Sequence, residues 1–174
     1  MKKTVRRILD GLYLAGGIAS ALCLIGIVTL IVLQIASRNI GFSFRGGPDY
    51  AGYAMAAASF LGFAYALNHG AHIRVTLMIS AMGRYRYWGE VWCFIVGTAI
   101  STVFAWFACK FTYESYRFND ISSGLDATPL WIPQLSMAIG SILLAICFWD
   151  NLITLLFTKK PNVIESSITD SGAE

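Results

Sequence analysis

The chain has 174 residues, of which 56% are hydrophobic and only 13% are charged. A typical soluble domain carries about 25% charged residues. Here the charges gather between long apolar runs, so the composition excludes an ordinary soluble domain and indicates a single-domain integral membrane protein. The net charge of +3 is too small to indicate a nucleic-acid partner. All four cysteines fall inside apolar runs, which favours small packing residues over disulfides or zinc ligands.

The first apolar run follows a short basic segment, as it does in a secretory signal peptide. Gly11 to Ser37 holds 27 residues without a charge. The apolar region of a signal peptide has roughly 7–15 residues and precedes a cleavage site of small residues. No convincing cleavage site follows here, so we expect a retained membrane helix over about residues 12–36.

The second apolar run, residues 49–68, is the one around which we expect the fold to be organised. Its uncharged part is about 28 Å long as a helix, close to the roughly 30 Å of a bilayer's hydrocarbon core. One face carries a small residue at every fourth position, a spacing that lets two helices approach closely in lipid. These residues are Ala54, Ala58, Gly62 and Ala66, and we expect them to form a helix-packing face or a partner interface.

The rest of the chain predicts two more membrane helices, over about residues 88–113 and 131–157. The apolar stretch 73–82 is too short to cross a membrane, and we expect it to lie along the interface. The polar tail, residues 161–174, is predicted to be disordered. The predicted fold is therefore an all-α integral membrane protein with four transmembrane helices and a short interfacial segment between the second and third.

The distribution of basic residues predicts the orientation. Nine Lys and Arg residues lie in the N-terminal segment, the second loop and the C-terminal junction, against three in the first and third loops. Cytoplasmic loops carry the excess of Lys and Arg. Both termini are therefore expected in the cytoplasm, which agrees with an even number of helices.

Several interfacial residues are candidates for structural roles. Arg38 and Asp49 lie on the same side of the membrane, where they either pair or remain two separate solvated charges. His72 and Arg74 are expected to fix the loop after the second helix or to touch lipid headgroups. His69 and His72 make a weak metal pair, because a glycine lies between them and no carboxylate or thiol stands nearby in sequence. We therefore expect neither a metal site nor a cofactor.

Asp150 is the one acid that lies inside an apolar run. Intramembrane acids call for a functional hypothesis, and a proton or cation site is one reading. The other reading is a structural pair with a basic group of the N-terminus or second loop. A stand-alone channel or proton-coupled carrier that uses Asp150, and an anchor subunit of a membrane oxidoreductase, are the alternative functions. Catalytic and phosphate-binding motifs are absent from the sequence, so we expect no enzyme.

Four segments, taken in their order and spacing, resemble the small membrane subunit (DctQ type) of tripartite ATP-independent periplasmic (TRAP) transporters. They are Gln34–Arg38, Phe60–Gly62, Gly70–Val75 and Thr128–Gln134. Many members of that family carry a Trp-x-Glu-Glu cluster before the second helix. In this chain its positions fall on Gly46, Pro48 and Asp49, so only one acid is present, and the substrates of members with the full cluster are not carried over.

The resemblance implies a three-component system in the bacterial inner membrane. A periplasmic binding protein would deliver an organic acid, such as a C4-dicarboxylate or sialic acid. A large many-helix subunit, present at about one copy per small subunit, would move it inward by a sodium-driven elevator motion. The small subunit would carry no substrate site and would extend the static scaffold of the large one, in contact with membrane lipid.

Overall fold

The computed structural model describes residues 3–41, 46–69, 86–124 and 127–158, and these are helical apart from short connections. Four helices are long and apolar enough to cross a membrane, and no strand is present in the described ranges. The predicted all-helical class with four spanning helices is therefore confirmed. The helices are α1 (Lys3–Ile40), α2 (Gly47–Asn68), α4 (Arg86–Phe118) and α5 (Trp131–Thr158).

The helices extend further than the apolar runs that predict them. With 38 residues, α1 begins at Lys3 instead of Leu12 and is about 57 Å long, and α4 continues to Phe118. Hydropathy marks the part of a helix that lies in hydrocarbon, whereas backbone hydrogen bonding continues into the headgroup layer. The proposed interfacial segment 73–82 and tail 161–174 lie outside the described residues.

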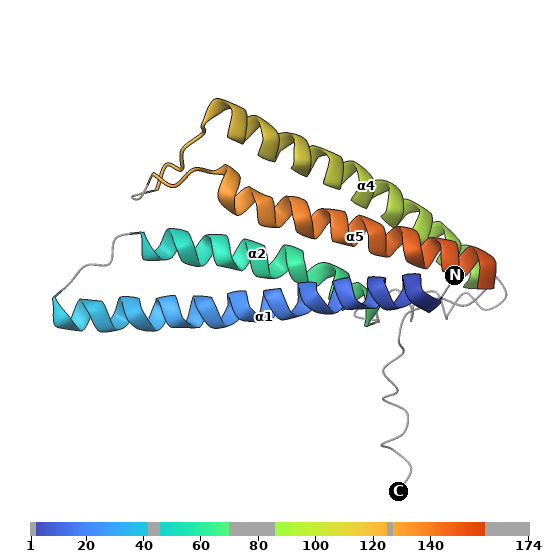
Figure 1. Cartoon of the computed structure of the whole chain (residues 1–174), viewed down its shortest axis with the longest axis horizontal. Coiled ribbons are helices and arrows are strands. Elements are labelled where there is room, and N and C mark those ends of the chain that lie inside the picture. The colour runs from blue at the N-terminus through green and yellow to red at the C-terminus, as the bar shows by residue number, and fades with distance from the viewer. Residues whose placement is uncertain (1–2, 42–45, 70–85, 125–126, 159–174) are drawn as a thin grey trace, which may run out of the picture.

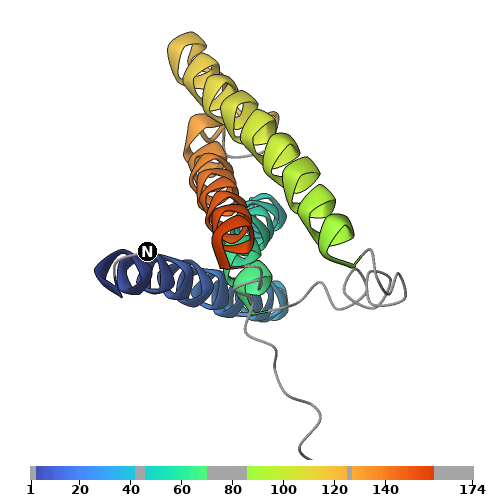
Figure 2. The same ribbon diagram turned by 90° about the vertical axis from the view of Figure 1, so that its right-hand side faces the viewer.

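The four helices form a curved row and not a closed bundle (Figures 1 and 2). Helices α2 and α5 pack against each other in the centre, α1 packs on α2, and α4 packs on α5. The helices run roughly along one direction, and the start of α1 and the end of α5 lie at the same end of them (Figure 1). The cytoplasmic location of that end stays a prediction.

Glycine and proline set the start of the central helix. Gly46 has a φ of 88°, in the left-handed region that a residue with a Cβ rarely adopts. Pro48 follows in the first turn of α2, where the missing N–H costs no helical hydrogen bond. A second proline, Pro133, occupies the equivalent first turn of α5. Both helices that form the centre of the row are thus fixed at their starts by the local sequence.

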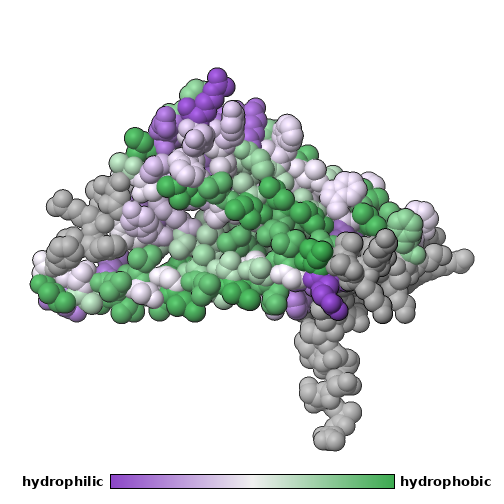
Figure 3. Space-filling model, viewed as in Figure 1, coloured by the Kyte–Doolittle hydropathy of each residue, from purple (hydrophilic) through white to green (hydrophobic). Residues whose placement is uncertain are grey.

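The outer surfaces of the row are apolar (Figure 3). Green residues cover the middle of the face that Figure 3 shows, while purple residues gather toward the helix ends. On α1 the exposed large apolar side chains are all aliphatic, whereas from Phe104 to Phe118 on α4 they are all aromatic. In lipid such faces need no covering by the chain itself, which explains why an open row is stable there.

Candidate packing and interaction sites

Three helices meet most closely at the middle of α2, around Phe60 and Leu61. A Cβ added to Gly140 of α5 would lie 2.5 Å from the carbonyl carbon and oxygen of Phe60. A Cβ added to Gly16 of α1 would lie 2.8 Å from the carbonyl oxygen of Leu61. Only glycine fits at these two positions without a shift of backbone, so both neighbours approach the main chain of α2 itself.

Two of the four small residues predicted on α2, Ala58 and Gly62, lie at this crossing with α1. The Ser20 hydroxyl of α1 donates a 2.6 Å hydrogen bond to the carbonyl oxygen of Ala58, which is buried. A Cβ at Gly62 would lie 2.9 Å from the same hydroxyl oxygen. Ala58 and Gly62 therefore pack α2 against α1 of the same chain. Ala54 and Ala66 are half-buried, and their packing role stays a prediction.

Asp150 lies at the other candidate site, where α5 meets the start of α1. Its side chain is 3% exposed, and its Oδ2 lies 3.3 Å from Nη1 of Arg6. The Arg6 Nε also lies 3.1 Å from Oδ1 of Asp10, one turn further along α1. Arg6 belongs to the basic N-terminal segment, one of the two segments in which the sequence predicts a basic partner for Asp150. The arginine thus joins the exposed end of α1 to a buried acid of α5.

Further polar groups surround this ion pair and form the polar cluster of Arg6, Tyr13, Cys147, Asp150 and Asn151. Asn151 is fully buried and donates from Nδ2 to the carbonyl oxygen of Cys147 at 2.9 Å. The Cys147 thiol lies 3.7 Å from the carbonyl oxygen of α2's Ala64. Tyr13 is buried in the same core. The polar cluster therefore connects α1, α2 and α5 at the end where α1 begins.

The sequence missed a second buried acid. Glu90, in the first turns of α4, is 8% exposed. Because it follows a basic loop and stands at the edge of an apolar run, its sequence context is that of a solvated interfacial charge. Among the described residues, no three His, Cys, Asp or Glu side chains gather in a way that could hold a metal ion.

At the opposite end, the connection between α4 and α5 is tied to the start of α2. The Tyr53 hydroxyl donates a 2.6 Å hydrogen bond to Oγ of Ser122. The Thr128 hydroxyl lies 3.4 Å from the hydroxyl oxygen of Tyr50. The turn signals of the connection are visible in the sequence, but its attachment to two tyrosines of another helix is not.

The remaining predicted residues are brought together only in part. Asp49 lies in the first turn of α2, and its carboxylate packs against Gly124 of the α4–α5 connection. Arg38 is exposed in the last turn of α1, at the same end of the helices as Asp49. Pairing of Arg38 with Asp49 stays a prediction. His72 and Arg74 lie outside the described residues.

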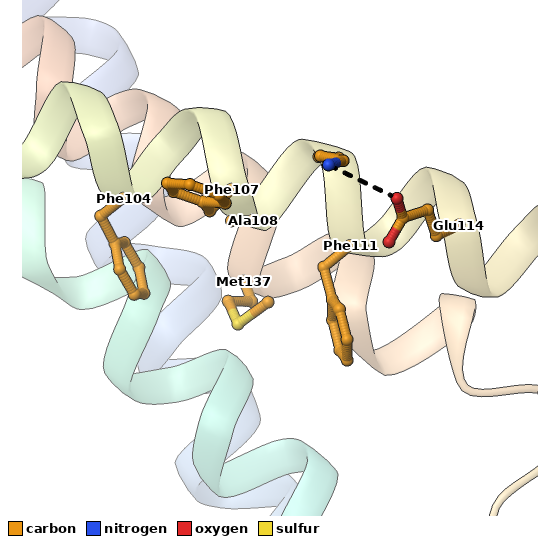
Figure 4. Close-up of a pocket in the computed structure, with 7 residues that line it drawn as sticks. Phe104, Phe107, Ala108, Phe111, Glu114 and Met137 are labelled. Carbon is orange, nitrogen blue, oxygen red and sulfur yellow. Dashed lines mark ion pairs between the residues drawn. The ribbon is translucent and has the colours of Figure 1, made fainter.

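A groove of about 390 Å³ runs along α4 where it packs on α5 (Figure 4). Its walls are mainly Phe104, Phe107 and Phe111, and Met137 of α5 lies across from them. An ion pair between Lys110 and Glu114, with Nζ 3.7 Å from Oε1, lies beside Phe111 in the half of the groove toward Glu114 (dashed in Figure 4). The groove is apolar with one pair of opposite charges in that half.

The family comparison decides the identity of this chain. The model of the family described as "Tripartite ATP-independent periplasmic transporters, DctQ component" matches residues 27–158. The chain belongs to the DctQ family. The match covers α1 from residue 27 onward and all of the other described residues, so the identification predicted from the sequence is confirmed. No curated protein matched in the comparison, and no solved structure did.

Membership makes this chain a small membrane subunit of a TRAP transporter. The four apolar helices agree with a multi-pass membrane location. The matched region includes Gly140 and Asp150, whereas Gly16, Ser20 and Arg6 precede it. At the crossing near Leu61 and at the Arg6–Asp150 pair, α1 therefore contributes residues that precede the match, while their partners on α2 and α5 lie within it.

Proposed function

We propose that this DctQ subunit extends the static scaffold of a large elevator-type TRAP subunit in the bacterial inner membrane. In this proposal the large subunit, present at about a 1:1 ratio, uses a sodium gradient to import an organic acid. A periplasmic binding protein delivers that acid, a C4-dicarboxylate, sialic acid or another carboxylate. The DctQ subunit itself binds no substrate and catalyses no reaction.

The observation that carries this proposal is the open row of helices with apolar outer faces. Buried hydroxyls in the middle of α4 and α5, such as those of Thr98 and Ser141, donate to carbonyl oxygens of their own helix, and the middle of the row is closed by the glycine contacts around Phe60 and Leu61. A row of this kind provides a long apolar wall on each flank. Such a wall suits a subunit that lies beside a larger membrane protein and holds one part of it still.

The alternative, a stand-alone channel or proton-coupled carrier using Asp150, has less support. The carboxylate of Asp150 is buried and lies beside the guanidinium of Arg6, which balances its charge. A transport site would expose its acid to a water-filled path during the cycle. The contact with Arg6 favours a structural pair that holds α1 on α5.

Purification of the tagged full chain from its native membrane in mild detergent tests the proposal. Mass spectrometry should find a large many-helix membrane protein in about a 1:1 ratio. Reconstitution of both membrane subunits with the binding protein should then give uptake that needs an inward sodium gradient. A homogeneous species containing only this chain, active in liposomes and inactivated by Asp150→Asn, would contradict the proposal and support the carrier.

Paired surface variants can identify the flank that meets the large subunit. Trp106→Ala with Phe107→Ala changes the aromatic flank on α4, and Leu22→Ala with Ile25→Ala changes the aliphatic flank on α1. All four side chains are exposed in the chain alone. The pair that lowers co-purification of the large subunit marks the interface, and the other pair is its control. If neither pair changes the yield, the interface lies on another face of the row.

A further inference from the structure

The groove beside α4 combines an apolar channel with a pair of opposite charges in the half toward Glu114. Lys110 and Glu114 are both about half-exposed, with side-chain exposures of 58% and 47%. Between Glu90 and Lys110, α4 carries no charged residue, a run of about 28 Å. That length equals the hydrocarbon core of a bilayer. The two charges therefore stand at the level where the core meets the headgroups.

The part of the groove on the core side of the charges fits within one leaflet. From Phe104 to Lys110 the helix rises about 9 Å, less than the roughly 15 Å of hydrocarbon in one leaflet. The walls along this rise are aromatic, with Ala108 and Met137 between them. Phe104 also stacks on Phe60 of α2 at a centroid distance of 5.9 Å, which closes the end of the groove that lies deepest in the membrane.

The volume of the groove separates two classes of occupant. A helix about 10 Å wide takes up roughly 400 Å³ per turn, so a groove of about 390 Å³ has room for a single turn. A helix of a neighbouring subunit would run past it and fill only a small part. A flexible hydrocarbon chain fits along its apolar part, between Phe104 and Met137.

We propose that this groove binds one phospholipid of the leaflet at the Glu114 end, with an acyl chain between Phe104 and Met137. The phosphate of the headgroup pairs with Lys110, and a primary ammonium pairs with Glu114. The charges of the protein pair and of a zwitterionic headgroup are complementary. Phosphatidylethanolamine satisfies both, whereas the methylated ammonium of phosphatidylcholine cannot donate hydrogen bonds to the carboxylate.

Native mass spectrometry of the full chain in detergent, titrated with an equimolar mixture of the two lipids, tests this site. We expect phosphatidylethanolamine to bind about threefold more than phosphatidylcholine, the size of effect that a half-exposed ion pair supports. Glu114→Gln should remove the preference. Lys110→Gln should weaken both lipids. Arg38→Gln changes an exposed cation on the far flank and should alter neither.

The apolar part is tested by Met137→Trp, which fills the groove and should lower the binding of both lipids severalfold. Circular dichroism checks that this variant keeps its helices. Equal binding of the two lipids to the unmodified chain, or a preference that survives Glu114→Gln, would overturn the proposal. So would a Met137→Trp variant that binds lipid normally but loses the large subunit, because the groove would then belong to that partner.

Discussion

Gly140 is the position at which the closest approach between α2 and α5 can be tested. A Cβ there would lie 2.5 Å from the backbone carbon and oxygen of Phe60. These are main-chain atoms of a helix, so they cannot move aside as the end of a side chain does. Gly140→Ala must therefore push α5 away from α2 along their contact. Overpacking of this kind costs about 1–3 kcal/mol.

Gly26 of α1 provides the matched control, because a Cβ there meets nothing within 4 Å. Both glycines lie inside helices, so both alanine variants gain helix propensity of up to about 1 kcal/mol. This gain cancels when the two variants are compared with each other. The comparison isolates the steric cost, and Gly140→Ala should be less stable than Gly26→Ala by about 1–3 kcal/mol.

Unfolding of both variants by SDS in mixed micelles, followed by circular dichroism, measures this difference. Gly26→Ala should unfold at the same SDS fraction as the unmodified chain or a higher one, and Gly140→Ala at a lower one. Equal midpoints for the two variants would refute the reasoning, because the backbone contact at Phe60 would then be absent in solution.

Three further predictions concern contacts at the two ends of the helices and at their middle. Arg6→Met leaves the buried carboxylate of Asp150 without its cation and should lower the free energy of unfolding by about 1–3 kcal/mol in the same SDS assay. Breaking a fully buried pair costs about 3–5 kcal/mol, and the lower value is expected here because Arg6 is partly exposed to solvent. Adding Asp150→Leu should restore most of that loss, and a double variant as unstable as the single one would contradict a charge effect. Tyr53→Phe should cost about 1 kcal/mol and speed amide hydrogen exchange in the α4–α5 connection, whereas unchanged exchange would argue against the tie. Ala58→Leu with Gly62→Leu should separate α1 from α2 and prevent assembly with the large subunit, and normal assembly and transport would show that this face is no critical contact.

The sequence predicts the number and order of the membrane helices because hydropathy depends on composition alone. It also indicates the close-packing face of α2, since small residues at every fourth position are visible in the sequence. Ala58 and Gly62 of that face lie against Ser20 of α1. What the pattern lacks is the identity of the neighbour, because a small residue fits equally well against the same chain or another subunit.

Side-chain pairs between distant segments are the part that could not be predicted. Asp150 had several basic groups within reach in principle, and the choice of Arg6 follows from the antiparallel placement of α1 and α5. The contact of Tyr53 with Ser122 depends likewise on how the α4–α5 connection lies against the start of α2. Such pairs require the three-dimensional arrangement, since each joins residues whose local sequences carry no sign of the other.

The length of α1 explains why the polar cluster lies where it does. From Arg6 to Arg38 the helix rises about 48 Å, slightly more than the roughly 40–45 Å of a bilayer with its headgroups. Both arginines thus reach the outer edges of the membrane, while α2, with 22 residues and one charge at Asp49 in its first turn, only spans the core at about 33 Å. The turns of α1 that hydropathy leaves out are therefore the ones that bring Arg6 to Asp150. Removal of residues 1–9 should leave a membrane-spanning α1 but release its end from α5, which cysteine cross-linking between positions 13 and 147 would detect as a lower yield. An unchanged yield would mean that the contacts around Ser20 hold α1 in place without the ion pair.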